Sequence, residues 1–400
     1  MKRTLLAAAL LGTFAIAHAA DLGSDNLSIT GFGTLAAAKS NTEDARYTRS
    51  NQREGTAGTT TIGLDSNLGL QATYKFSDKL SATTQILSRK STGDSFTTEL
   101  AWAFVKYQVN DDVAVRVGRV VMPTFLISDY QNVGYANTMM RPPTELYGSN
   151  FLENIDGADV SWQHSVGETN FTAQAVAGVV RGKAYTAQDK SVERFQSPHA
   201  AFAFTAERGP VLLRVAHVRG KLTIDAKDLN MLADAVSHAG FGQFASDFSM
   251  REKKVISFTS VGLMADWNNI VVQSEYGIRR GVDKMFLADA DAWYTMAGYR
   301  FGKVLPYYAH GSFKSKPSVD IPAGLANIPA LYGAMSGILA PTGQKSDTIG
   351  VRWDFAKSAA LKVQVDRIKP GVKNALLSDV TPAGVGKNVT VVAAGVDFVF

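Results

Sequence analysis

Basic side chains recur inside segments whose neighbouring positions are apolar. In TIGVRWDF, Arg352 stands between Val351 and Trp353, and Lys362 has the same setting in ALKVQVDRI. Side chains alternate between the two faces of a strand, so these cations share one face and the apolar residues the other. The same argument gives a set of basic residues on polar strand faces: Arg116, Arg214, Arg279, Arg300, Arg352 and Lys362. Such a set of cations attracts anions. In the alternative, these charges only keep the surface hydrated, and Asp354, Asp366 and Glu275 partly cancel them.

No residue pattern indicates catalysis or metal binding. The histidines after residue 19 are His164, His199, His217, His238 and His310, and none lies in a catalytic or zinc motif. The chain has no cysteine, which excludes disulfides and thiolate metal sites. The net charge of +5, or +3 without Lys2 and Arg3, is too small to indicate nucleic-acid binding. We therefore expect no enzyme activity, no cofactor, no metal and no nucleic-acid partner.

The elements that must position the charged side chains are β-strands. About sixteen segments alternate in polarity, and the connections between them alternate between short and long. The short connections are 77–79, 110–112, 167–168, 208–210, 268–269, 302–303 and 356–358, and the long ones include 40–58, 123–156, 183–197, 225–252, 281–289, 317–346 and 370–387. This order predicts an all-β fold, an antiparallel up-and-down transmembrane barrel. A soluble sandwich, the alternative, would mix loop lengths at both ends.

The C-terminal segment NVTVVAAGVDFVF indicates which medium surrounds the barrel. Val396, Phe398 and Phe400 lie on one face of this strand, and a bulky apolar C-terminus is favourable where lipid covers that face. Further aromatic residues lie beside short connections: Phe76, Tyr107, Trp267, Phe301 and Phe355. Aromatic rings favour the bilayer interface, so we expect a girdle at the short-turn rim. Hydrocarbon cannot satisfy an open sheet edge, so the last strand must pair with the first.

The N-terminal residues have the three parts of an export signal. Lys2 and Arg3 are followed by an apolar stretch of about twelve residues and by the small-residue site Ala17-His18-Ala19. The stretch is too short to cross a bilayer, which takes about 20 apolar residues. We expect residues 1–19 to be a cleaved signal peptide and residues 20–400 to form one barrel domain. The alternative is a hydrophobic N-terminal helix of the mature fold.

Taken together, these features resemble the Gram-negative outer-membrane porins. The resemblance rests on the signal segment, the first strand SITGFGTLAA, the terminal Phe strand and a long third external loop at 123–156, and it covers the whole mature chain. It implies an outer-membrane location, a homotrimer and passive diffusion of small hydrophilic solutes. It also implies that the barrel-assembly machinery recognises the C-terminal strand. The third loop lacks the Pro-Glu-Phe signature of the general porins, so their constriction residues cannot be transferred.

A barrel of about sixteen strands leaves a water-filled lumen. We expect the third loop to fold into this lumen and to constrict it with charged residues: Asp129, Arg141, Glu145, Glu153 and Asp156. Acidic groups facing the basic wall would set up a transverse field. In the alternative, the loop covers the mouth or contacts a neighbouring subunit. Helical spacing predicts a short helix in loop 225–252, and the apolar loop 317–346 folds either into the vestibule or against a neighbour.

The sequence thus predicts an outer-membrane diffusion channel for small hydrophilic solutes, with a weak preference for anions. The channel is either nonspecific or tuned to phosphate, sulfate or organic anions. The alternative function is a closed outer-membrane barrel that serves as a structural anchor or adhesin without an open pore.

Overall fold

The computed structural model describes residues 26–150, 152–186, 191–223, 227–371 and 376–400. The expected signal peptide, residues 1–19, and the expected mature N-terminus at Ala20 lie outside the described residues. Within the described ranges, no helix is long and apolar enough to cross a membrane.

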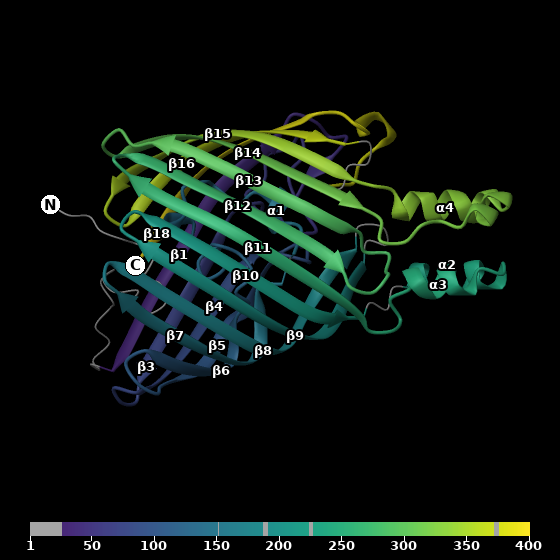
Figure 1. Ribbon diagram of the computed structural model, residues 1–400. Helices are drawn as coiled ribbons and strands as arrows, with labels where there is room; N and C mark the ends of the chain where they lie inside the picture. Colours follow the sequence, from purple (N-terminus) through teal and green to yellow (C-terminus); the bar gives the residue numbers. More distant parts are fainter. Residues whose placement is uncertain (1–25, 151, 187–190, 224–226, 372–375) are drawn as a thin grey trace.

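The described residues form a closed antiparallel barrel of sixteen strands, as the sequence predicts (Figure 1). Each strand pairs with its neighbours in sequence order, and β1 pairs with both β3 and β18. The barrel strands are β1 (Leu27–Ser40), β3 (Asn67–Lys75), β4 (Leu80–Lys90), β5 (Phe96–Gln108), β6 (Val113–Val121), β7 (Asn154–Val166), β8 (Thr169–Thr186), β9 (Ser191–Arg208), β10 (Val211–Leu222), β11 (Lys254–Trp267), β12 (Ile270–Gly281), β13 (Asp289–Tyr299), β14 (Val304–Lys316), β15 (Gly343–Ala356), β16 (Ala359–Pro370) and β18 (Val389–Val399).

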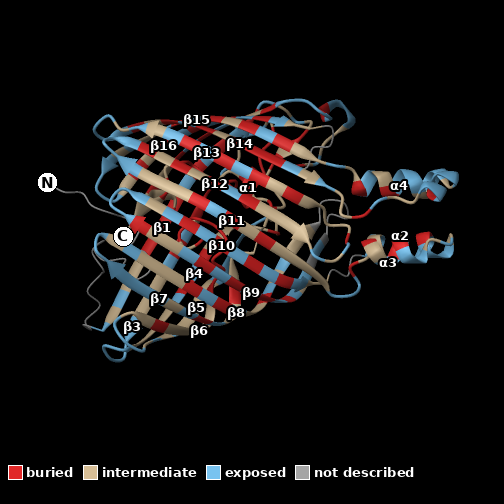
Figure 2. Cartoon of the chain, in the orientation of Figure 1, coloured by how far each residue is buried: buried red, intermediate tan, exposed pale blue. Residues whose placement is uncertain are grey.

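The two faces of the strands differ in burial with the expected period of two (Figure 2). On β15, Ile349, Val351 and Trp353 are exposed on the outer face, whereas Thr348 and Gly350 are buried inside. The aromatic residues expected at the short-turn rim are all exposed: Phe76, Tyr107, Trp267, Phe301, Phe355 and Phe400. An apolar outer wall with aromatic rings at its short-turn end is the surface that a lipid bilayer favours.

The barrel closes where β18 meets β1. Gly33 lies opposite Phe398, and the Gly31 amide donates to the Phe400 carbonyl at 2.7 Å. The Phe398 and Phe400 rings stack with centroids 6.3 Å apart and cover the two glycines, so that a Cβ atom on Gly33 would lie 2.5 Å from the Phe398 ring. The Gly-Phe-Gly sequence of β1 therefore makes room for the terminal aromatic residues of β18.

Short turns occupy the end of the barrel where β1 begins and β18 ends, and long connections occupy the other end (Figure 1). Asn268 and Asn269 both have positive φ angles, which the two-residue turn between β11 and β12 requires. One expected long loop is wrong: most of 183–197 is strand, because β8 extends to Thr186 and β9 begins at Ser191. These strand ends contain several charged residues, so their sequence resembles that of a loop.

Helices extend beyond the barrel at the long-loop end (Figures 1 and 2). The expected helix in loop 225–252 is present as α2 (Lys227–His238), followed by α3 (Gly242–Phe248), and loop 317–346 contains η3 (Ala323–Asn327) and α4 (Pro329–Leu339). Val236, Phe248, Leu325 and Met335 belong to one buried cluster. The apolar loop therefore packs against α2 and α3 outside the barrel and not in the vestibule, and its contact with a neighbouring subunit stays a prediction. The first and last loops pair through β2 (Arg46–Tyr47) and β17 (Leu377–Ser378), and η4 (Pro382–Gly384) follows.

The connection between β6 and β7, residues 122–153, is named loop L3 here. L3 contains η2 (Gly134–Ala136) and α1 (Thr144–Tyr147), and its apolar residues belong to the same buried cluster as inward residues of the wall. Phe125 and Tyr147 have ring centroids 4.3 Å apart, and Phe125 also packs edge-on against Phe258 of β11. L3 thus lies inside the barrel, as expected.

The β1–β18 closure predicts coupling between Gly33 and Phe398. Gly33→Val should lower the free energy of unfolding by about 1–3 kcal/mol, because the new side chain displaces the Phe398 ring. In the double variant with Phe398→Ala the clash is absent, so its stability should match that of Phe398→Ala alone. Urea unfolding in detergent, followed by the heat-modifiable gel shift of folded barrels, measures both values. Gly93→Val, in open space, is the control. Additive losses in the double variant would contradict this packing.

Candidate functional site

Arg141 of L3 forms a buried ion-pair cluster that joins the loop to the wall. Its guanidinium contacts Asp65 through two bonds of 2.6 and 2.8 Å and also bonds Asp366 of β16. The side chains of Arg141 and Asp65 are each 1% exposed, and Thr348 and Gln364 donate to the Asp366 carboxylate. An ion cluster removed from water is stable only when its hydrogen bonds are satisfied, as they are here. Arg141 therefore anchors the loop rather than projecting into open lumen.

Two of the expected wall cations hold the middle of L3. Lys362 is fully buried, pairs with Asp397 at 2.8 Å and donates to the carbonyls of Gly134 and Met139. Arg352 donates to the Asn137 carbonyl at 2.8 Å. Both side chains point inward, as expected, but they are covered by the loop. L3 carbonyl groups accept from Lys362 and from one nitrogen of Arg352, whose other nitrogens contact Asp354.

The C-terminal part of L3 is fixed in a similar way. Arg279 donates to the Ser149 carbonyl at 2.8 Å, and Glu145 accepts a 2.8 Å bond from Gln344 of β15. Burial raises the pKa of Glu145. Glu275 of β12 accepts bonds from the Leu126 amide at 2.8 Å and the Tyr147 hydroxyl at 3.0 Å. Glu145 and Arg279 are thus structural contacts of the loop in this conformation.

Two expected site residues lie elsewhere. Asp156 belongs to β7, not to the loop, and it shares its strand face with exposed Val160. It pairs there with Arg119 at 2.6 Å and Arg181 at 3.0 Å, so it does not constrict the lumen. Arg300 lies at the short-turn rim, beyond the end of β13, and pairs with the partly exposed Asp266. Asp156 therefore faces outward, and Arg300 lies beyond the end of its strand.

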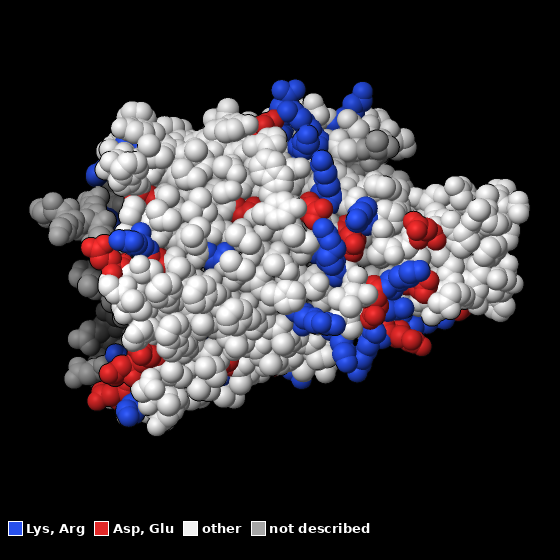
Figure 3. Space-filling view, in the orientation of Figure 1, with Lys and Arg blue, Asp and Glu red and all other residues white. Residues whose placement is uncertain are grey.

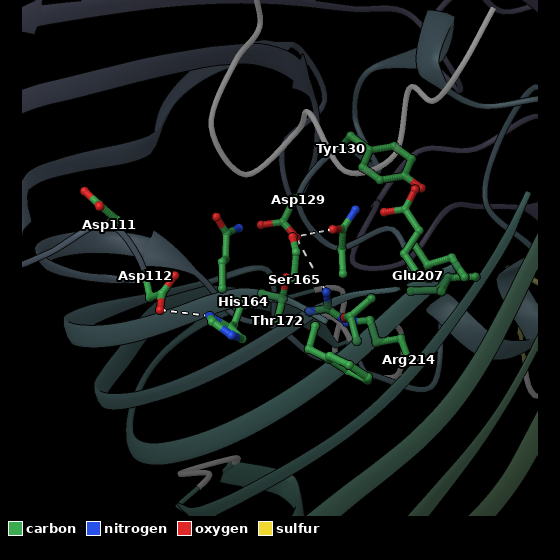
Figure 4. A pocket seen from close by; sticks show the side chains of 15 residues that line it. Asp111, Asp112, Asp129, Tyr130, His164, Ser165, Thr172, Glu207 and Arg214 are labelled. Carbon is green, nitrogen blue, oxygen red and sulfur yellow. Dashed lines mark hydrogen bonds and ion pairs between the residues drawn. The ribbon is translucent and has the colours of Figure 1, made fainter. Parts of the chain in front are cut away.

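Cavities lie on both sides of the L3 segment 125–131. The cavity toward the short turns has a volume of about 370 Å³ and includes Asp129, Tyr130, Glu207 and Arg214 in its lining (Figure 4). The cavity toward the long loops is lined by residues of the connection between β1 and β3, of β4 and of L3: Arg49, Arg89, Phe125, Ser128, Gln131 and Glu153 are among them. The segment 125–131 therefore separates two chambers of the lumen. We name the cavity toward the short turns the inner chamber and the cavity toward the long loops the outer chamber.

The inner chamber contains incompletely bonded charged groups. Arg214 of β10 is 7% exposed, and its Nη1 atom lies 3.9 Å from Asp129 of L3. Figure 4 shows these two side chains converging from the wall and the loop. Among the described residues, Nε and Nη2 of Arg214 and one oxygen of Glu207 have no hydrogen-bond partner. Arg116, also expected in the wall, points inward and forms an ion pair with Asp159, with its guanidinium 5.1 Å from the Phe104 ring centroid.

The outer chamber contains two arginines that sequence reasoning missed. Arg89 holds Glu153 through two bonds of 2.9 Å, which keep the pKa of Glu153 lowered even though burial acts to raise it. Burial lowers the pKa of Arg49, and no ion pair joins it to another residue of the described chain. Arg49 lies in an irregular loop, so no strand period signals its position. Arg89 could have been found from the alternation of β4.

Comparison with known proteins is consistent with this architecture. The family described as phosphate-selective porin O and P matches residues 62–369. The chain belongs to this family. It is therefore an outer-membrane porin, a diffusion channel, and a sealed anchor or adhesin is not favoured. No curated protein sequence matches the chain.

Solved porins share the fold at low sequence identity. The in-vitro folded OmpT of Vibrio cholerae, in a trimer form, is 13% identical with a TM-score of 0.55 over 94% of this chain and 100% of its own. An anion-selective porin from Comamonas acidovorans is 13% identical, with a TM-score of 0.54 over 94% and 99%. The Salmonella typhi OmpF complex with daunomycin is 17% identical, with a TM-score of 0.54 over 94% and 98%. These similarities are at the level of the barrel.

The Arg141 cluster predicts that L3 position depends on one buried cation. Arg141→Gln leaves Asp65 and Asp366 buried without their partner, so unfolding should become about 3–5 kcal/mol easier. Release of the loop should also raise single-channel conductance and expose L3 to proteases.

Arg300→Gln serves as the matched control, because its ion pair is partly exposed and its loss should cost less than about 1 kcal/mol. Unchanged conductance and proteolysis in Arg141→Gln would contradict the anchoring role.

Proposed function

We propose that this porin passes small hydrophilic solutes with a weak preference for anions, including inorganic phosphate. The observation that carries this proposal is Arg214, which lines the inner chamber and has two buried guanidinium nitrogens without a hydrogen-bond partner among the described residues. A guanidinium with free donors recognises phosphate and carboxylate oxygens. The family's description as phosphate-selective and the anion-selective porin of similar fold also support it.

The other site residues limit the strength of the preference. Asp129 and Glu207 line the same chamber as Arg214 and would repel anions. Most other lumen cations are neutralised by ion pairs, as in Arg116 with Asp159 and Lys362 with Asp397. Arg49, at the outer chamber, adds one cation on the path. We propose that these opposed charges give a modest selectivity. The proposal assigns no catalytic role to any residue.

Arg214→Gln tests the selectivity. Because one charge in a partly hydrated chamber is worth up to about 1 kcal/mol, the ratio of anion to cation permeability should fall by about two- to fivefold. Reversal potentials across a planar bilayer in a KCl gradient measure this ratio, and a second series with phosphate measures the preferred anion.

Arg214→Lys keeps the charge and should keep the chloride selectivity. A clear cation preference of the unsubstituted protein would reject anion preference, and an unchanged ratio in Arg214→Gln would reject the role of this residue.

We also propose that the protein is a homotrimer that buries the outer face of β3–β5. Near their long-loop ends, these strands expose apolar residues: Leu68, Ile86, Phe96 and Leu100. A contiguous apolar face outside a water-filled barrel suits subunit contact or lipid. The trimer form among the similar folds favours contact. Leu68→Arg with Leu100→Arg should convert a trimer to a monomer in detergent, measured by light scattering. A monomeric unsubstituted protein would contradict the proposal.

Export and assembly complete the proposal. Residues 1–19 act as the cleaved signal peptide, and the C-terminal strand with Val396, Phe398 and Phe400 is the segment that the barrel-assembly machinery recognises. The outward position of these three side chains on the closing strand supports this role.

A further inference from the structure

A band of basic residues encircles part of the outer wall, near the long-loop ends of β10 and β14–β16. Six exposed cations compose this band, which we name the basic belt: Arg219, Lys221, Lys314, Lys316, Lys345 and Arg367. Figure 3 shows basic side chains gathered at this level, with an uncharged surface of the barrel beside them. The belt residues share their strand faces with lipid-facing apolar residues such as Val215 and Ile349, so they project outward and not into the lumen.

Strand register places these cations at a common level. Ser257 of β11 lies opposite both Arg219 and Arg280, and Asp291 of β13 lies opposite Lys314. On β15 and β16, each belt residue lies within two positions of the residue that pairs with the belt position on the preceding strand. Residues far apart in the sequence therefore form one continuous charged surface.

The height of the belt matches the outer boundary of the hydrocarbon. On β14, Lys314 is ten residues from Val304, and on β15, Lys345 is ten residues from Phe355; Val304 and Phe355 lie beside short turns. Ten strand residues span about 33 Å, which at a typical tilt of about 40° corresponds to a height of about 25 Å. The apolar band of outer-membrane barrels is also about 25 Å tall. The cations thus begin where hydrocarbon ends.

The belt cations are not neutralised by the protein. Nearby acidic residues pair with other cations: Asp291 with Arg280 at 2.6 Å and Asp347 with Lys369 at 2.6 Å. Within the described part of the chain, none of the six belt residues has an ion pair or a side-chain hydrogen bond. Flexible cations without internal partners, at a lipid interface, require anions from their surroundings.

We propose that the basic belt binds the phosphate-bearing headgroups of lipids in the outer leaflet. Charge complementarity favours this occupant, because the belt presents six unpaired cations and the adjoining wall is apolar enough to hold the acyl chains. The outer wall of β3–β5 exposes apolar residues instead, among them Leu68, Ile86 and Leu100. The protein therefore has a lipid-binding side that is distinct from the side proposed for subunit contact. This inference does not depend on the solute that the pore passes.

The test uses the full-length mature barrel in detergent micelles and native mass spectrometry, with phosphatidylglycerol as the probe. The variant Arg219→Gln, Lys314→Gln, Lys345→Gln, Arg367→Gln should bind phosphatidylglycerol at least about tenfold more weakly than the unsubstituted protein. A control variant removes four exposed lysines outside the belt, Lys79→Gln, Lys253→Gln, Lys303→Gln, Lys387→Gln, and should retain its affinity. Phosphatidylcholine, whose headgroup is neutral overall, should bind weakly to all three proteins.

Equal phosphatidylglycerol affinity in the belt variant and the unsubstituted protein would overturn the proposal. Displacement of phosphatidylglycerol by an equal concentration of inorganic phosphate would also overturn the proposal, because the belt would then bind free anions. Loss of the oligomer in the belt variant would overturn it in favour of a subunit interface. If the belt variant does not fold, salt titration of the unsubstituted protein decides. Bound phosphatidylglycerol should dissociate as ionic strength rises, and salt-independent binding would reject the electrostatic basis.

Discussion

The constraint on which the structure depends is that hydrocarbon offers no hydrogen bonds to the peptide backbone. A sheet that crosses the bilayer must therefore have no free edge, and here β18 removes that edge by pairing with β1. The stacked rings of Phe398 and Phe400 lie over Gly31 and Gly33 at this junction. The same constraint sets the outer surface: apolar residues face lipid, aromatic rings mark the short-turn boundary and cations mark the other.

Closure with sixteen strands creates an interior too wide for wall side chains to fill, and L3 occupies part of it. An inserted loop exposes many backbone carbonyl and amide groups, which need partners. Lys362 and Arg352 of the wall satisfy three L3 carbonyls, and Glu275 satisfies the Leu126 amide. Charged residues of the lumen thus serve mainly to position the loop. Only a few, such as Arg214 and Arg49, line the two chambers without a close ion pair among the described residues.

Much of the fold could be predicted from the sequence because the period of two is local. The inward orientation of Arg352 and Lys362 and the outward orientation of Phe398 followed from their immediate neighbours. The contacts of L3 are not local: Arg141 lies 225 residues from Asp366, and Lys362 lies 228 residues from Gly134. No periodicity specifies the path of an irregular loop. The sequence therefore indicated that the loop enters the pore but not that it covers the cations expected to line the wall.

The central claim is that the L3 segment 125–131 divides a water-filled lumen into two chambers. The absence of cysteine allows a direct measurement with single introduced thiols, because Gln131 lines the outer chamber and Asp129 the inner one. A maleimide polymer too wide to pass the constriction is applied to each side of an oriented bilayer. Gln131→Cys should react only from the long-loop side and Asp129→Cys only from the short-turn side. Reaction of both thiols from the same side would contradict the account.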